Sequence, residues 1–337
     1  MVDDPLISIC IPTYNRADMV GKAIESALAQ TYLHIEVIVV DNASTDRTED
    51  VVRKFSDDRL HFHRNPRNIG LFGNFNMCIE LAHGDYIHIL HSDDYIDPDF
   101  TNTCIRFFLD HPHVDLTFSS AKILTANHET DLSFSEKDEI FVAPEGFRHV
   151  LKDRSFIICP SVIMKRGVYE RHGNYSLEYP YSSDLNQWLK ITRVHDIGFV
   201  RNAWVYYRQG EHSESYHLLF TNVTGYLDTL KIFSNLIRSL GDDRSSFNTE
   251  LNIMFRRFAL DCLYAGFARI DTMTGFKSSF FTGIALTSWS MMRSSSIRDW
   301  VTKWILLIIL MFAGGIMGIS PLRALFKRLF LMKTTQY

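Results

Sequence analysis

Short apolar runs alternate with helical patterns through the first half of the chain. Two of these runs, ISICI at residues 7–11 and IEVIVV at residues 35–40, are almost continuously apolar. Such runs are typical of strands that are covered on both faces of a parallel sheet. Between them, apolar positions recur every three or four residues, which predicts a helix over residues 17–29. Pro12 predicts that the first strand ends directly after its apolar run.

The same alternation extends to about residue 210. Further strands are predicted at residues 60–64, 86–90, 115–120, 157–164 and 198–208, and further helices from about 46 to 55, at 71–83, at 184–195 and over most of 216–290. Strand–helix alternation at this spacing predicts right-handed βαβ units. The expected fold class is α/β, with a mostly parallel central sheet and a helical C-terminal region.

Polar clusters follow three of the predicted strands. They are Pro-Thr-Tyr-Asn at residues 12–15, Asp41 with Asn42, and His-Ser-Asp-Asp at residues 91–94. Ligands of open α/β sheets bind beyond the carboxyl ends of the strands. Three clusters at such positions therefore favour a ligand site over a set of ordinary turns.

The residue types in these clusters indicate an anionic ligand that is bound through a metal ion. Asp93 and Asp94 stand at a strand end, where carboxylates can hold Mg²⁺ or Mn²⁺ against phosphate oxygens. Asp41 offers a free carboxylate near the place of a base or a ribose, and Tyr14 offers a ring on which a nucleobase can stack. An acid pair alone is more often part of a turn or a helix cap, so the prediction depends on the combination.

The composition is that of a globular chain in a reducing compartment. Hydrophobic residues make up 46% of the chain and charged residues 22%, which excludes a disordered or low-complexity protein. The net charge of −4 shows no basic excess, so nucleic acid is not expected as a partner. The five cysteines contain no CxxC pair, which argues against a disulfide scaffold or a cysteine zinc site. They are expected to be small buried side chains.

The two ends of the chain bear on its location. The N-terminal MVDDPLISIC has two acids and no basic segment, so no signal peptide is expected, and the bulk of the chain is placed in the cytoplasm. Near the other end, residues 304–319 contain no charge. A helix of this length spans about 24 Å, short of the roughly 30 Å hydrocarbon core of a bilayer.

The segment after Pro321 has the pattern of a helix that lies in an anionic membrane interface. Apolar residues share one helical face and basic residues flank it: Leu322, Leu325, Phe326, Leu329 and Phe330, with Arg323, Lys327 and Arg328. Re-entrant or in-plane membrane contact is favoured over a full span. The alternative is a buried helix followed by a solvated basic tail.

Together, these blocks resemble the inverting family 2 glycosyltransferases with the GT-A fold, of the bacterial polysaccharide and O-antigen type. The resemblance rests on ISICIPTYNR (7–16), QTYLHIEVIVVDNASTD (30–46), NIG (68–70), GDYIHILHSDDYIDPDF (84–100), SSDLNQWLK (182–190) and YYRQGEHSES (206–215). It implies a Rossmann-like GT-A domain, a nucleotide-diphosphate sugar donor and Mn²⁺ or Mg²⁺ as cofactor.

The resemblance also implies a role for each matching residue. The expected nucleotide-binding residues are Pro12, Thr13, Tyr14, Asn15, Asp41, Asn68, Ser92 and Arg208. Among these, Asp41 matches the aspartate that contacts the base, and Arg208 matches a residue that approaches the diphosphate. Asp93 matches the metal ligand of the DxDD motif, and His212 matches a late residue that sometimes reaches the metal. Asp184 matches the usual catalytic base.

Two residues depart from the family's pattern. His91 takes the place of the first aspartate of the DxDD motif, and Ser183 takes the place of the glutamate before the base. A histidine can still bind Mn²⁺ or a ribose, so His91 is kept as a weaker candidate ligand, with a lower metal affinity expected. Asp184 is also predicted to open a helix, where an acid can cap the first turn, and the two roles are compatible.

The expected function is metal-dependent transfer of a hexosyl or deoxyhexosyl group, with inversion, to a lipid-linked or surface-glycan acceptor. The expected organisation is a catalytic domain at 1–215, a helical region at 216–296 and a membrane-associating segment at 297–337. This segment would hold a peripheral or monotopic protein on the cytoplasmic leaflet of the inner membrane. One alternative is a sugar-phosphate nucleotidyltransferase, whose glycine-rich phosphate loop is absent after ISICIP. The other is a catalytically degenerate, membrane-associated protein that binds nucleotide sugars.

Overall fold

The computed structural model describes residues 4–210, 213 and 224–268. The chain divides into two compact units, residues 1–229 and residues 230–337. The first unit is built on one sheet, and the described part of the second is helical. The domain boundaries predicted after residues 215 and 296 fall outside the described residues and stay predictions.

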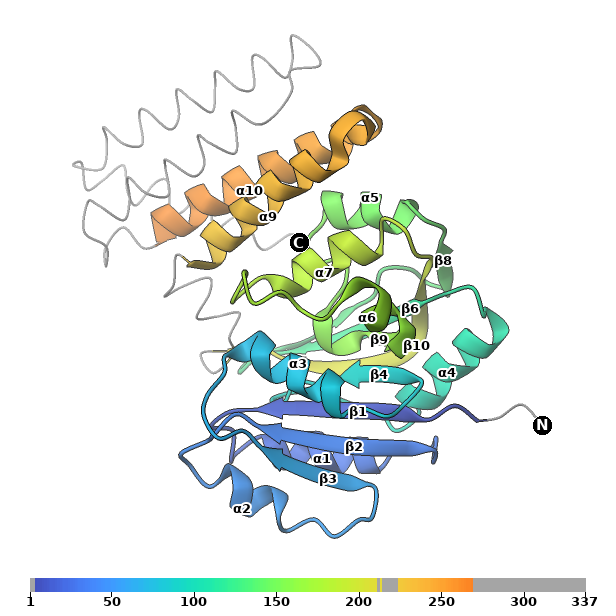
Figure 1. Ribbon diagram of the computed structural model, residues 1–337, viewed down its shortest axis with the longest axis vertical. Coiled ribbons are helices and arrows are strands. Elements are labelled where there is room, and N and C mark those ends of the chain that lie inside the picture. The colour runs from blue at the N-terminus through green and yellow to red at the C-terminus, as the bar shows by residue number, and fades with distance from the viewer. Residues whose placement is uncertain (1–3, 211–212, 214–223, 269–337) are drawn as a thin grey trace. The chain divides into compact units, whose positions relative to one another are not determined.

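The first half of the sheet is parallel and alternates with helices, as predicted (Figure 1). It contains β1 (Ile7–Thr13), α1 (Val20–Leu28), β2 (Ile35–Asp41), α2 (Thr48–Val52), β3 (Leu60–Arg64), α3 (Leu71–Leu81) and β4 (Tyr86–Ile89). The strands lie in the order β3-β2-β1-β4. Because all four run parallel, their carboxyl ends meet at one edge of the sheet.

The second half of the sheet is mixed. It contains β5 (Tyr95–Ile96), α4 (Phe100–Asp110), β6 (Leu116–Leu124), β7 (Glu129–Leu132), β8 (Glu139–Phe141), α5 (Glu145–Lys152), η1 (Cys159–Ser161), β9 (Ile163–Lys165), α6 (Arg166–His172), α7 (Ser183–Ile191) and β10 (Ile197–Arg208). β10 is parallel to β6, but β9 lies between β4 and β6 and is antiparallel to both. β5, β7 and β8 also pair antiparallel.

The expectation of a mostly parallel sheet is therefore wrong for this second half. For the β6–β7 pair the physical reason is the length of the connection. β6 and β7 are joined by a tight turn in which Thr125 N–H donates to the carbonyl oxygen of His128 at 2.9 Å. A strand that returns after so short a turn has to run antiparallel, because a parallel partner needs a crossover of a dozen or more residues.

β1 continues through Pro12, so the predicted stop at this proline is wrong. Pro12 and Thr13 both pair with β2. On its other side, β1 pairs with β4 only as far as Cys10. The missing N–H of Pro12 lies on this open side, so no ladder hydrogen bond is lost. The two extra residues carry Thr13 to the edge of the sheet where the polar clusters meet.

Only the end of the strand predicted over residues 157–164 forms a strand. The short 3₁₀ helix η1 holds Pro160, and β9 begins only at Ile163. Pro160 has no N–H to donate to a ladder, and its carbonyl oxygen accepts a hydrogen bond from Nε2 of buried His88 at 2.8 Å. This turn places Cys159 beside His91, in the loop that follows β4.

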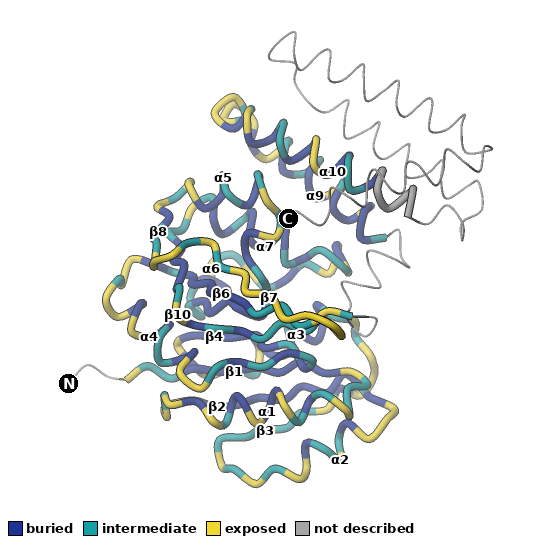
Figure 2. The backbone as a smooth tube through the Cα atoms, turned by 180° about the vertical axis from the view of Figure 1, so that it is seen from behind, coloured by how far each residue is buried: buried dark blue, intermediate teal, exposed yellow. Residues whose placement is uncertain are grey.

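Helices cover both faces of the parallel half. Ile7, Ile9 and Ile11 of β1 share one core with residues of α1 and α4. On the opposite face, the Cys10 thiol donates to the carbonyl oxygen of Cys78 in α3 at 3.6 Å. Figure 2 shows β1 and β2 as buried strands inside this arrangement. Burial on both faces explains why these two strands are almost continuously apolar.

The helical pattern predicted over residues 216–290 is confirmed where the structure describes it. α9 (Thr224–Leu240) and α10 (Asn248–Ala268) are joined by η2 (Gly241–Phe247). Phe233 of α9 packs edge-on against Phe255 and Phe258 of α10, with ring-centroid distances of 5.7 and 5.4 Å. Among the described residues, no helix is both long and apolar enough to cross a bilayer. The apolar run at 304–319 lies outside them.

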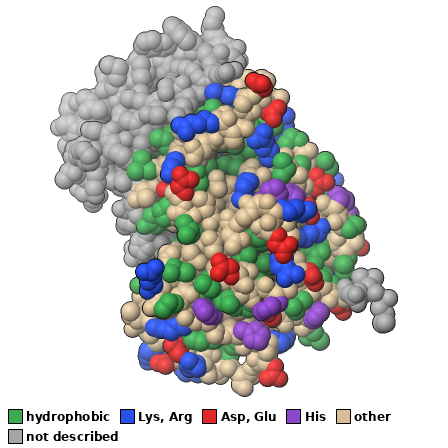
Figure 3. Space-filling view, viewed as in Figure 1, with side chains coloured by type: hydrophobic (Ala, Val, Ile, Leu, Met, Phe, Trp, Pro, Cys, Tyr) green, Lys and Arg blue, Asp and Glu red, His purple; other side chains and the backbone are tan. Residues whose placement is uncertain are grey.

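Charged side chains are interspersed on the surface of the first unit. On the face shown in Figure 3, the described basic and acidic side chains alternate rather than gather into a patch of one sign.

Candidate functional site

The loops that follow β1 and β2 are tied together at the carboxyl edge of the sheet. The backbone N–H of Asn15 donates to the Ser44 hydroxyl at 2.8 Å, and the N–H of Thr45 donates to Asn15 Oδ1 at 2.8 Å. Asn15 and Ala43 both adopt a positive φ, of 51° and 61°, which few residues with a side chain do. The two loops therefore form one connected wall, here called the β1–β2 wall.

The β1–β2 wall holds the residues of the predicted first nucleotide-binding loop. Pro12 and Thr13 are buried, and the Thr13 hydroxyl has no hydrogen-bond partner among the described residues. Tyr14, in contrast, is 40% exposed. An exposed aromatic ring on this polar edge is available to stack on a planar ligand.

Asp41 ends β2 and is completely buried. Its Oδ2 accepts a hydrogen bond from Arg64 Nη1 at 2.6 Å, and its Oδ1 accepts from the hydroxyl and the backbone N–H of Ser44. The expectation of a free carboxylate at this position is therefore wrong, because both oxygens already have partners.

Arg64 is a member of the site that the sequence pattern did not single out. It also donates from Nη2 to the carbonyl oxygen of Ser44 at 2.8 Å, and its side chain is 39% exposed. The signal that could have found it is its place: Arg64 ends β3 in register with Asp41 at the end of β2. Parallel neighbours that end together present their last side chains at the same edge.

Asparagine side chains connect the loop after β3 to the β1–β2 wall. Asn42 Nδ2 donates to Asn68 Oδ1 at 2.9 Å, and Asn42 Oδ1 accepts from the N–H of Ile69 at 2.9 Å. Asn65 Nδ2 also donates to Asn42 Oδ1, at 3.2 Å. Gly70 follows with a φ of 83°, which glycine adopts readily. Asn68 thus lies at the site edge, and its side-chain oxygen holds the loop in place.

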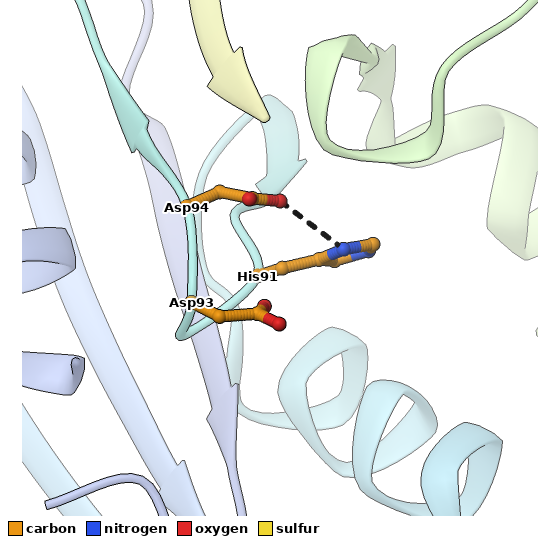
Figure 4. A group of neighbouring side chains, drawn as sticks. All are labelled: His91, Asp93 and Asp94. Atoms are coloured by element: carbon orange, nitrogen blue, oxygen red, sulfur yellow. Dashed lines mark ion pairs between the residues drawn. The ribbon is translucent and has the colours of Figure 1, made fainter. Parts of the chain in front are cut away.

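The loop between β4 and β5 carries the predicted metal-binding residues. His91, Asp93 and Asp94 point to the same side of this loop, with the imidazole between the two carboxylates (Figure 4). One ligand atom from each of the three lies within 4.8 Å of the others. Ser92 is buried in the same turn. The three candidate ligands therefore converge on one point. We call the segment that carries them, residues 91–94, the His91–Asp94 loop.

Asp94 is completely buried and organises this loop. Its Oδ1 accepts the backbone N–H of Arg208 at 2.8 Å, and its Oδ2 lies 3.4 Å from Nδ1 of His91. Burial raises the pKa of Asp94 to about 6. Burial opposes the charged form of His91, but the neighbouring Asp94 and Cys159 outweigh it and hold the pKa of His91 well above its usual value. The charged form of His91 is therefore favoured by its neighbours in this loop.

Cys159 is a further member of the site that the cysteine pattern missed. It is only partly buried, and its thiol lies against the His91 imidazole. The other cysteines are buried, as expected for small core side chains: Cys10, Cys78, Cys104 and Cys262. No spacing in the sequence links Cys159 to His91, because the contact joins η1 to a loop from the first half of the chain.

The side chains of the His91–Asp94 loop fit a divalent cation. Oδ2 of buried Asp94 and Nε2 of His91 have no hydrogen-bond partner among the described residues. His91 Nδ1 lies 3.4 Å from this buried carboxylate oxygen without a hydrogen bond, so a divalent cation would supply a closer positive charge. Carboxylate oxygens from Asp93 and Asp94 are the hard ligands that Mg²⁺ and Mn²⁺ prefer. His91 offers a lone pair only after it loses a proton, so it is the weaker of the three.

α7 brings Asp184 to the same site. Asp184 is the second residue of the helix, with Ser182 at the N-cap, which confirms the first-turn position predicted from the sequence. Its Oδ1 accepts the backbone N–H of Leu185 at 2.8 Å. Burial raises the pKa of Asp184, and the charge of His91 acts in the opposite direction. Asp184 is therefore in electrostatic contact with the His91–Asp94 loop.

Arg208 ends β10 and is fixed to the same loop. Its Nη1 donates to the carbonyl oxygen of Asp93 at 2.8 Å. The fold therefore brings Arg208 to Asp93 and Asp94 from a region far away in the sequence. His212, the remaining predicted metal ligand, lies outside the described residues.

Comparisons with known proteins identify the family of the chain. The family model described as glycosyl transferase family 2 matches residues 8–173. The UDP-Glc:alpha-D-GlcNAc-diphosphoundecaprenol beta-1,3-glucosyltransferase WfaP of Escherichia coli is 32% identical over 188 residues, which cover 55% of this chain and 70% of that protein. An uncharacterized glycosyltransferase of Rickettsia typhi is 33% identical over 203 residues, or 58% of this chain. The match spans 61% of that relative, which is less than two thirds of its length.

Two solved structures share the fold. S. aureus TarS 1–349 in complex with UDP-GlcNAc superimposes with a TM-score of 0.65 at 17% identity, covering 85% of this chain and 81% of that chain. The mannosyltransferase PcManGT from Pyrobaculum calidifontis, in complex with GDP-Man and Mn²⁺, gives a TM-score of 0.55 at 17% identity, covering 92% and 87%. At this identity the likeness shows the fold alone, an α/β domain of the GT-A type. The matching family model and the identity to WfaP together show that the chain belongs to glycosyl transferase family 2.

Proposed function

We propose that this protein is an inverting, metal-dependent transferase that moves a sugar from a nucleotide-diphosphate donor to a hydroxyl group of a lipid-linked or surface-glycan acceptor. The observation that carries the proposal is the convergence of Asp93 and Asp94 in the His91–Asp94 loop, with Arg208 held against both of them at 2.8 Å. Displacement at C1 of a sugar needs a base for the incoming hydroxyl and positive charge for the leaving diphosphate. Asp184 is proposed for the first role, and Arg208 with the bound cation for the second.

The β1–β2 wall is proposed to bind the nucleoside. Tyr14 exposes a ring on which the base can stack, and the Asp41–Arg64 pair lies at the neighbouring strand ends. Because Asp41 is buried and the Arg64 side chain is 39% exposed, we expect the donor to meet Arg64 first. Pro12, Thr13, Asn15, Asn68 and Ser92 shape the loops around it.

The His91–Asp94 loop is proposed to face the diphosphate. Asp93 and Asp94 are the residues expected to hold Mn²⁺ or Mg²⁺, with His91 as a third ligand if it loses its proton. His212, which lies outside the described residues, is proposed as a further ligand. When bound, the ion neutralises negative charge on the phosphate oxygens. Arg208 adds a positive charge that belongs to the protein itself and that is held in place by the Asp93 carbonyl oxygen.

Asp184 is proposed to accept the proton of the acceptor hydroxyl. As the acceptor oxygen forms its bond to C1 of the sugar, the bond from C1 to the diphosphate oxygen breaks on the opposite face, so the configuration at C1 inverts. The proton of the hydroxyl passes to the Asp184 carboxylate. Burial raises the pKa of this carboxyl above that of an exposed aspartate, which makes the carboxylate a stronger base.

A lipid-linked acceptor is supported by the relative WfaP, whose name specifies a diphosphoundecaprenol-linked acceptor. It is also supported by the apolar and basic pattern of residues 297–337, which predicts contact with an anionic membrane surface. Both observations favour a site that works at the cytoplasmic leaflet.

The test is a donor panel assayed with the full chain. UDP-, GDP- and dTDP-sugars are incubated with a diphosphoundecaprenol-linked sugar, with and without Mn²⁺, and the released nucleotide and the anomeric configuration of the product are measured. We expect nucleoside diphosphate release that depends on the cation, and an inverted product. Glu145→Gln, which changes the first-turn acid of α5 outside the site, serves as the matched control for Asp184→Asn.

The other readings give different products. Release of pyrophosphate from a sugar phosphate and a nucleoside triphosphate would support a nucleotidyltransferase instead. Donor binding without turnover on any acceptor would support a degenerate binding protein. A product that retains the donor's configuration would contradict the direct displacement assigned to Asp184.

A further inference from the structure

Two tyrosines lie beside the site without a part in the chemistry described so far. Tyr95 follows Asp94 directly on β5, and Tyr206 lies on β10, two residues before Arg208. β5 and β10 are antiparallel, and Tyr95 and Tyr206 are directly opposite each other in the ladder. Their rings are stacked, with centroids 4.3 Å apart and planes inclined by 10°.

The stacked rings support Arg208. Its guanidinium carbon lies 4.9 Å from the centroid of the Tyr95 ring. The contacts therefore run continuously from Tyr206 through Tyr95 to Arg208. A guanidinium against an aromatic face is attracted by the ring quadrupole, and the attraction is larger where water is partly excluded. All three side chains are half-buried.

The other contacts of Arg208 fix its place against the His91–Asp94 loop. Its backbone N–H donates to Asp94 Oδ1 and its Nη1 donates to the Asp93 carbonyl oxygen, each at 2.8 Å. Figure 4 shows the end of β10 directed at Asp94. A guanidinium has five N–H donors, and within the described residues a single one is used, on Asp93. The remaining donors have no partner among the described residues and are the ones that we assign to the diphosphate.

We infer that Tyr95 and Tyr206 are positioning residues that hold the Arg208 guanidinium in place for the diphosphate of the donor. An unsupported arginine loses much rotamer freedom when it binds a phosphate, and a side chain that is already ordered loses less. The stacked rings supply this order before the donor arrives. The inference rests on the proposed function, since it is that function which assigns Arg208 to the diphosphate.

A purely structural role for the rings makes different predictions. β5 is two residues long and pairs with β10 at the edge of the sheet, so a ring stack also strengthens a short edge strand. If that were its only role, loss of the stack would lower the affinity of the site for all of its ligands equally. If the stack positions Arg208, its loss lowers the affinity for ligands that carry the second phosphate and leaves the affinity for ligands without it unchanged.

The experiment compares nucleoside diphosphates with monophosphates by calorimetric titration of the full chain, using UDP and UMP, and GDP and GMP. We expect Tyr206→Leu and Tyr95→Leu each to weaken diphosphate binding by about 3- to 10-fold, while monophosphate binding stays within about 2-fold. Tyr206→Phe and Tyr95→Phe keep the rings and are expected to bind like the unmodified protein.

The chain offers a matched control on the same strand. The Trp204 ring lies between Lys122 Nζ at 5.1 Å and the Arg201 guanidinium carbon at 5.2 Å, so Trp204→Leu removes a similar cation–aromatic contact that does not involve Arg208. We expect this variant to keep the preference for diphosphates. A double-mutant cycle completes the test: Tyr206→Leu is expected to add nothing to the loss that Arg208→Ala already causes.

Several outcomes would overturn the inference. They are an equal loss for diphosphates and monophosphates, additive losses in the cycle, or a Phe variant as weak as the Leu variant. Failure of both Leu variants to fold, with Trp204→Leu folded, would show that the rings are structural. If Arg208→Ala loses the diphosphate preference and the Leu variants keep it, only the positioning role is wrong. If Arg208→Ala itself keeps that preference, the error lies in the proposed function.

Discussion

Burial raises the pKa of Asp184, and this changes the pH at which the residue can act as a base. A base must be ionised, so the rate falls as the pH falls through its pKa. An exposed aspartate titrates at about 3.9, and we therefore expect the acid limb of the kcat profile to lie above that pH. A profile measured at saturating donor checks this. A limb at or below the value for an exposed carboxyl would contradict the assignment of this limb to Asp184.

The Asp184→Asn variant separates the base role from the helix role of the same residue. Loss of a general base costs roughly 10²-fold or more in rate, so we expect at least this loss in transfer. Affinity for the nucleoside diphosphate should change little, because Asp184 faces the acceptor in the proposed function. The control Glu145→Gln should leave the rate unchanged. If donor affinity fell as far as the rate, Asp184 would be a structural first-turn acid instead.

A further prediction concerns Asp93 as a metal ligand. In Asp93→Ala we expect Mn²⁺ affinity to fall by at least about 10-fold, since even the outer-shell partners of a metal are worth 10- to 100-fold. Metal-dependent turnover should be lost while thermal unfolding is unchanged. Mn²⁺ binding followed by electron paramagnetic resonance measures the affinity directly. Asp110→Ala, which removes an exposed acid at the end of α4, is the control, and an equal loss in both variants would exclude Asp93 as a ligand.

At the scale of elements, one buried acid joins β1, β2 and the segment before β4. Glu36 of β2 accepts hydrogen bonds from the Ser8 hydroxyl at 2.5 Å and from the His83 N–H at 2.7 Å. Burial opposes its ionisation, but these hydrogen bonds outweigh burial and lower the pKa of Glu36. The element junction is therefore held by an ionised group.

This junction makes the fold sensitive to acid. The pKa of Glu36 is lower in the folded chain than in the unfolded chain, so its contribution is present above about pH 4.3 and is lost as the pH falls through the folded value. We expect Glu36→Gln to be less stable than the unmodified protein at pH 7, with a difference that shrinks in acid. Urea unfolding at several pH values measures it. The exposed Glu25→Gln should show no such trend.

The same junction has no room for a side chain at Gly84. A Cβ there would lie 2.6 Å from the Ser8 nitrogen and 2.8 Å from the Leu6 carbonyl oxygen, both backbone atoms. We expect Gly84→Ala to reduce the free energy of unfolding by about 1–3 kcal/mol, the usual cost of overpacking. In Gly167→Ala the new Cβ meets nothing nearer than 4.0 Å, so this helical position should tolerate the same change. Equal stability of the two variants would contradict the close packing at Gly84.

At the scale of the whole molecule, the site residues all lie before residue 216, and the predicted membrane-binding pattern lies after residue 296. We expect the full chain with Arg323, Lys327 and Arg328 replaced by glutamate to bind anionic vesicles more than about 10-fold less tightly, since each basic residue near such a surface is worth roughly 1 kcal/mol. High salt should have the same effect on the unmodified chain. Co-sedimentation with vesicles measures both.

A charge-matched control uses exposed basic residues of the described domain. Lys54, Arg106 and Lys137 replaced by glutamate change the net charge equally but should leave vesicle binding nearly intact. Equal loss in both triple variants would mean that net charge alone decides binding. Binding that ignores both the tail substitutions and salt would contradict an interfacial tail helix and support a buried one.

The sequence by itself determined the parallel half of the fold and the place of the site. The apolar runs of β1 and β2 are buried on both faces, and a run with that pattern has few other stable environments. The polar clusters after β1, β2 and β4 follow from the same logic, because parallel strands end at a common edge. The family motifs added the roles expected of Asp93, Asp184 and Arg208.

Only the tertiary structure decided which groups share that edge and in what state. Arg64 donates to Asp41, Cys159 lies against His91, and Tyr206 stacks on Tyr95. Each of these contacts joins residues that are far apart in the chain. The Asp41–Arg64 and Tyr95–Tyr206 contacts also depend on the register of the paired strands. The mixed half of the sheet and the passage of β1 through Pro12 depend likewise on which partner strand is present. The local sequence pattern predicts whether a residue is buried. Its hydrogen-bond partners and its pKa depend on neighbours that come together only when the chain folds.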